Sequence, residues 1–93
     1  DVLEHVLPTE EGKFMAMAAE LAPVTIIGMP SLESQFYASP FSRDNHVNCK
    51  SEDQLRTLMQ TYYRHVFMFG MNDEVVHTGF GPLCHYRFAL GVR

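Results

Sequence analysis

The sequence has few positive charges, and those it has are not clustered. Its 93 residues carry seven Lys and Arg against eleven Asp and Glu, which gives a formal charge of −4. Proteins that bind a phosphate backbone rely on grouped cations to displace counterions. Because the basic residues here are scattered along the chain, we expect no nucleic-acid partner.

Long apolar segments are also missing. The continuous apolar runs are far shorter than the roughly 20 residues that a membrane-spanning helix needs. No basic stretch followed by an apolar segment marks a signal peptide. The sequence therefore predicts no membrane span and a soluble protein, cytoplasmic or organellar.

Cysteine is scarce, since Cys49 and Cys84 are the only two. Two cysteines in a chain of this size do not make a disulfide-dense secreted scaffold. We expect two reduced thiols that behave as small apolar side chains, with a disulfide or one reactive thiol as the alternatives.

Apolar residues are plentiful, at 46% of the chain, so residues 1–93 can form a single small domain with its own core. The best-marked segment is Ser51–Gly70. Ser51 and Gln54 have the spacing of a capping box, and Gly70 suits the position after a helix. An apolar stripe follows helical spacing, formed by Leu55, Leu58, Met59, Tyr62, Val66 and Phe69. We predict one helix over this whole segment.

Strand patterns occur near the middle and at the end of the chain. Val24–Ile27 is rich in β-branched residues. Cys84–Val92 alternates, and we expect its bulky apolar face to be buried: Cys84, Tyr86, Phe88, Leu90 and Val92. Glu74–Thr78 is predicted to pair with it as a hairpin across Gly79–Pro82.

A helix is also predicted after Thr9, ending before Pro23, and Ser39–Lys50 is expected to be a polar loop. The elements together predict an α+β fold: a small antiparallel sheet, including a C-terminal hairpin, covered on one face by two helices.

The histidines and cysteines suggest two candidate chemical sites. His46 and Cys49 have a spacing that can deliver two ligands to one zinc ion. Cys84 and His85 are adjacent on a strand and point to opposite faces, so they do not complete a four-ligand site. We therefore expect no metal and no cofactor. In the predicted hairpin His77 lies opposite Cys84, where an imidazole can activate a thiol nucleophile.

A third candidate is a polar patch for an anionic ligand. Arg43 and His46 come from the predicted loop, and Arg87 from the last strand. A solvated loop with local turns at Asp and Asn explains the same residues.

Several large apolar residues have no evident place in the core. They are Phe67, Met68, Met71 and Phe80. Methionine and aromatic residues are enriched at interfaces. We therefore predict a non-catalytic interaction or assembly module with a protein partner or a homo-oligomer. The alternative is a small enzyme, or a ligand- or metal-binding domain, with a pocket lined by Cys and His.

Overall fold

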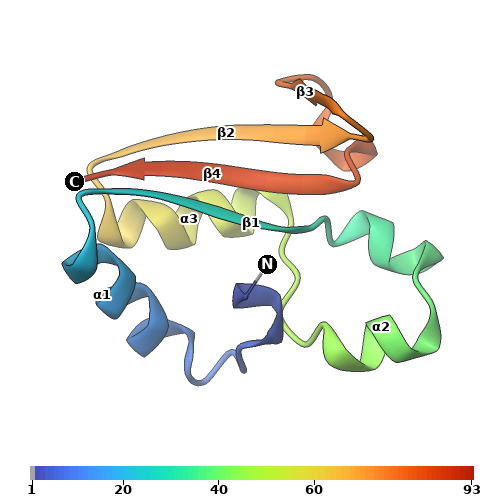
Figure 1. Ribbon diagram of the computed structural model, residues 1–93, viewed down its shortest axis with the longest axis horizontal. Helices are drawn as coiled ribbons and strands as arrows, with labels where there is room; N and C mark the ends of the chain where they lie inside the picture. The colour runs from blue at the N-terminus through green and yellow to red at the C-terminus, as the bar shows by residue number, and fades with distance from the viewer. Residues whose placement is uncertain (1) are drawn as a thin grey trace.

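The computed structural model describes residues 2–93, which form a four-stranded antiparallel sheet with its helices on one side (Figure 1). The predicted α+β class is therefore confirmed. No helix among residues 2–93 is both long enough and apolar enough to cross a bilayer. The elements in chain order are η1 (Leu3–His5), α1 (Glu11–Leu21), β1 (Val24–Pro30), η2 (Glu33–Tyr37), α2 (Pro40–Asn45), α3 (Glu52–Tyr62), β2 (His65–Asn72), β3 (Val75–His77), η3 (Gly81–Leu83) and β4 (Tyr86–Val92).

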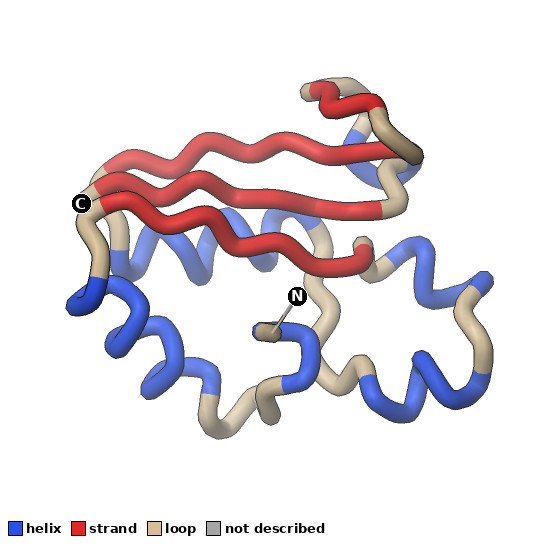
Figure 2. The backbone as a smooth tube through the Cα atoms, in the orientation of Figure 1, coloured by secondary structure: helices blue, strands red, loops and turns tan. Residues whose placement is uncertain are grey.

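The strands lie in the order β1-β4-β2-β3. Figure 2 shows β1, β4 and β2 side by side as the three long strands, with α1 and α3 on one side of them. The last strand in the sequence therefore occupies the centre of the sheet. It pairs with β1 along one edge and with β2 along the other.

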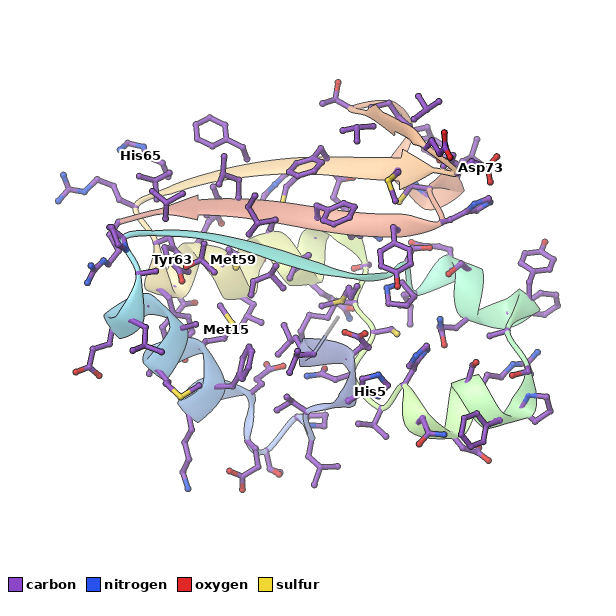
Figure 3. All side chains as sticks on the ribbon, viewed as in Figure 1. His5, Met15, Met59, Tyr63, His65 and Asp73 are labelled. Atoms are coloured by element: carbon purple, nitrogen blue, oxygen red, sulfur yellow. The ribbon has the colours of Figure 1, made fainter. Side chains whose placement is uncertain are left out.

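The core lies between the sheet and the helices α1 and α3. Met15 of α1 and Met59 of α3 are completely buried, and Tyr63 is 3% exposed. Figure 3 shows these three side chains between the helices and the sheet, whereas His65 lies on the other side. The Tyr63 hydroxyl donates to Thr25 Oγ1 at 2.7 Å, which ties the end of α3 to β1.

The prediction of one helix over Ser51–Gly70 is right at its start and wrong at its end. Ser51 and Gln54 form both hydrogen bonds of the capping box. The helix stops at Tyr62, and β2 begins at His65. Val66–Phe69 matches helical spacing in part, but a β-branched and aromatic run favours extended backbone. As a strand, it sends alternate apolar side chains to the two faces of the sheet.

The alternation of the last strand is confirmed, but the buried face is the opposite of the predicted one. Arg87, Ala89 and Gly91 face the helices and are buried. A Cβ at Gly91 would lie 2.6 Å from the Tyr63 ring. At this end of β4 the inward residue is small because Met59 and Tyr63 already fill the space beside it.

The C-terminal hairpin joins β2 to β3, through a two-residue turn at Asp73 and Glu74. Asp73 has a φ of 51°, a left-handed conformation that Asp tolerates better than most residues. His77 therefore lies opposite Gly70 in the sheet, and the predicted pairing of Glu74–Thr78 with Cys84–Val92 is wrong.

The remaining segments differ less from expectation. The first helix and the strand at Val24 are confirmed as α1 and β1, and β1 continues to Pro30. The predicted polar loop over Ser39–Lys50 contains the short helix α2, where the Ser39 hydroxyl accepts from the Ser42 amide.

The capping box gives a test of the fold. Ser51→Ala should lower the free energy of unfolding by about 1 kcal/mol, because α3 loses the acceptor for an amide in its first turn. Urea denaturation measures this change. Ser39→Ala is the matched control and should cost less, since α2 buries no residue. Equal losses in the two variants would contradict this account of α3.

Candidate functional site

His77 and Cys84 line the same small pocket, near the end of the sheet where β3 lies. The backbone amide of Gly79 donates to His77 Nδ1 at 3.1 Å. The other ring nitrogen, Nε2, therefore carries the proton and lies 2.7 Å from Asn72 Oδ1. Both ring nitrogens of His77 are thus engaged with groups other than the thiol.

Cys84 is 3% exposed. Burial raises the pKa of its thiol, while the positive charge of Arg87 acts in the opposite direction. The net shift is upward, so the thiol stays protonated at neutral pH. This environment is that of an inert buried cysteine, not of an activated nucleophile.

Arg87 is buried, with 1% of its surface exposed, and its contacts are structural. Its Nη1 lies 3.2 Å from Glu33 Oε2, and its Nη2 donates to the Gly81 carbonyl at 2.8 Å. A third contact joins Nη1 to the Lys50 carbonyl at 3.4 Å. One guanidinium thereby connects η2, η3 and the segment before α3.

Arg43 and His46 make contacts separate from those of Arg87. Arg43 is exposed on α2 and donates to the carbonyls of Ala38 and Phe36. His46 directly follows α2, and its Nδ1 lies 3.0 Å from Gln35 Oε1. Among residues 2–93, the structure shows no partner shared by the three residues of the predicted polar patch.

Cys49 is half-buried. Burial and the negative charge of Glu4 together raise the pKa of its thiol to about 11. His46, its predicted partner, lies instead beside His5, with the two ring centroids 5.0 Å apart. The sequence does not predict that Glu4 and His5 lie beside His46, because no spacing rule links residues some 40 positions apart.

The side of the sheet away from the helices is an extended apolar surface, which we call the open face. Cross-strand register places one residue from each long strand in every row, for example Ile26, Leu90 and Phe67. No element formed by residues 2–93 covers this side of the three long strands (Figure 1). Its apolar residues are Val24, Ile26, Phe67, Phe69, Met71, Val76, Phe88, Leu90 and Val92.

Several side chains of the open face are more than half exposed. Val24, Ile26, Phe67 and Val76 retain 53%, 61%, 58% and 60% of their accessible surface. Near the middle of the face, the rings of Phe69 and Phe88 stack, with centroids 5.1 Å apart and planes at 8°. A Cβ at Gly28 would lie 2.6 Å from the Phe88 ring, so glycine lets this ring lie flat over β1.

The four predicted interaction residues fall in three places. Phe67 and Met71 belong to the open face. Met68 points toward the helices, where it packs against the core. Phe80 is 70% exposed and directly precedes η3, outside the sheet. The strand alternation in 66–71 was the signal that separates Phe67 and Met71 from Met68.

Comparison of the chain with protein-family models, with curated proteins and with solved structures finds no match.

The state of Cys84 can be tested by thiol alkylation. In a Cys49→Ser background, alkylation of Cys84 in the native protein should be slow, and His77→Ala should leave its rate unchanged. The physical reason is that burial, not His77, controls the reactivity of the Cys84 thiol. Mass spectrometry follows the reaction, and denatured protein gives the unhindered rate. A clear slowing by His77→Ala would show that the imidazole does activate the thiol.

Proposed function

We propose that this chain is a non-catalytic interaction module that associates with a second copy of itself through the open face. The observation that carries the proposal is the apolar character of both faces of one sheet, of which the helices cover only one. Antiparallel sheets with one face in water usually alternate apolar and polar residues. The three long strands here do not follow that pattern.

The size of the open face supports this proposal. A half-exposed aromatic side chain presents about 100 Å², and Val and Ile present less, so the four most exposed residues present roughly 300 Å² together. The less exposed Phe69, Phe88 and Leu90 extend the same surface. Monomeric proteins seldom expose a contiguous apolar patch larger than a few hundred Å² without a function for it.

A second copy of this chain is the partner that suits this surface. A standard specific interface buries about 800 Å² on each partner, with an apolar centre and a polar rim. The open face supplies an apolar centre whose area is of the right order for such an interface. The charged and polar residues His65, Arg64 and Arg93 lie at one end of it, where β2 begins and β4 ends.

Two such sheets can pack face to face about 10 Å apart, as the layers of a β-sandwich do. With a twofold axis through the open face, the same surface of each copy forms the interface. Twofold dimers are the commonest oligomers. In that assembly each sheet has helices on its outer side and the partner sheet on its inner side. Both apolar faces are then covered.

The proposal predicts a concentration-dependent dimer that one charge disrupts. Phe67→Glu should weaken association about 30-fold or more, equivalent to ~2 kcal/mol, because a carboxylate at the centre of the interface loses its hydration. Light scattering over a dilution series measures the dissociation constant.

Phe41→Glu is the matched control for this experiment. Phe41 is 78% exposed and lies on α2, away from the sheet, so this variant should dimerise like the parent chain. Urea denaturation checks that both variants unfold cooperatively. A parent chain that stays monomeric at high concentration would overturn self-association, as would equal effects of the two variants.

A further inference from the structure

We propose that Glu4, His5 and His46 form a binding site for one divalent transition-metal ion. One ligand atom from each of the three residues lies within 4.8 Å of the other two. Glu4 and His5 belong to η1, and His46 directly follows α2. The site lies away from the open face, and the inference does not depend on self-association.

Both imidazoles are oriented for metal binding. His5 Nδ1 lies 2.8 Å from the Asn45 carbonyl oxygen, and His46 Nδ1 lies 3.0 Å from Gln35 Oε1. A carbonyl oxygen only accepts hydrogen bonds, so each Nδ1 carries the proton. In the neutral rings each Nε2 then has a free lone pair. Metal-bound histidines are held in this way by outer oxygen acceptors.

The carboxylate of Glu4 gives the second, independent observation. Glu4 is 2% exposed, and its Oε2 is buried with no hydrogen-bond partner among residues 2–93. Leaving a buried charged oxygen without a partner is costly. A cation bound between this carboxylate and the imidazoles offsets the charge of the buried carboxylate.

The spacing is close to that of a metal centre. His5 Nε2 lies 3.7 Å from Glu4 Oε1. In a tetrahedral site with metal–ligand bonds of 2.0–2.1 Å, ligand atoms lie about 3.4 Å apart. A small rotation of the Glu4 and His5 side chains therefore brings these two atoms to that separation, and all three ligand atoms already lie within 4.8 Å of one another.

Hydrogen bonds hold the two ligand-bearing segments together. The backbone amide of Asn48 donates to the Glu4 carbonyl at 3.0 Å. The side-chain amide of Asn48 donates to Glu11 Oε2 at 2.7 Å. The His5 ring is 48% exposed, which leaves a route from solvent to the site. Figure 3 shows His5 where η1 meets the segment that follows α2.

The ligand set indicates the class of metal. Two imidazoles and one carboxylate suit Zn²⁺, Co²⁺ or Ni²⁺, whereas Mg²⁺ and Ca²⁺ prefer oxygen ligands alone. Three protein ligands also leave coordination positions for water or a small ligand. Such sets occur in open metal sites rather than closed structural ones.

Metal titration of the chelator-treated chain tests the proposal. Co²⁺ binding is followed by visible absorbance, and Zn²⁺ binding by calorimetry. We expect one ion per chain, competition between the two metals, and a higher melting temperature in Zn²⁺, since a ligand that binds only the folded state stabilises it. Mg²⁺ should have no effect.

Variants assign the binding to these residues. His5→Gln and His46→Gln should each weaken Zn²⁺ binding by about 100-fold or more, because loss of a ligand costs at least as much as loss of an outer partner. His65→Gln is the matched control, since His65 is an exposed histidine on the other side of the sheet. It should bind as the parent chain does.

Three results would overturn the proposal. The first is a parent chain without saturable binding of one ion. The second is an equal loss of affinity in His65→Gln, which indicates adventitious binding to surface histidines. The third is binding that Cys49→Ser abolishes and His5→Gln retains, which indicates a thiol site. If His46→Gln does not fold, His5→Gln decides, because the His5 ring is half exposed.

Discussion

Burial of one sheet face by the helices is the constraint on which the rest of this structure depends. Helices α1 and α3 cover one side of β1, β4 and β2, and the core lies in that layer. The opposite side of the same strands carries equally apolar residues, including Ile26 and Phe67. A sheet that is apolar on both faces needs a second cover, and our functional proposal follows from that need.

Beside the end of α3, side-chain size decides which face of β4 the helices take. On β4 the inward residues Ala89 and Gly91 are small, so Met59 and Tyr63 can approach the strand closely. The larger Phe88 and Leu90 of the same strand therefore point to the open face. If the larger set faced inward, it would compete with the α3 side chains for one layer of close-packed space.

Much of the fold could be predicted from local patterns in the sequence. The capping box at Ser51 marked the start of α3, and the alternation after Cys84 marked the central strand. The end of α3 could not be predicted in the same way, because Val66 and Phe69 fit both a helix and a strand. The choice between them depends on pairing with β4, which lies far along the chain.

The candidate sites were harder to predict than the fold. Phe67 and Met71 were identified as surplus apolar residues, but the face they share became visible only with the strand register. Sequence spacing pairs His46 with Cys49, three positions later. The histidine closest to His46 is His5, which long-range packing of η1 against the end of α2 brings to it. Sequence spacing contains no information about such a contact.

Solvent accessibility of the open face in solution tests the central claim most directly. In the intact chain, a soluble paramagnetic agent broadens methyl signals according to their exposure. Ile26 is 61% exposed in the isolated chain and Leu32, off the sheet, is 43% exposed. We predict that, at concentrations where the chain associates, the Ile26 methyls are better protected than those of Leu32, and that dilution reverses this order. Ile26 methyls that remain the more exposed at every concentration would contradict the account.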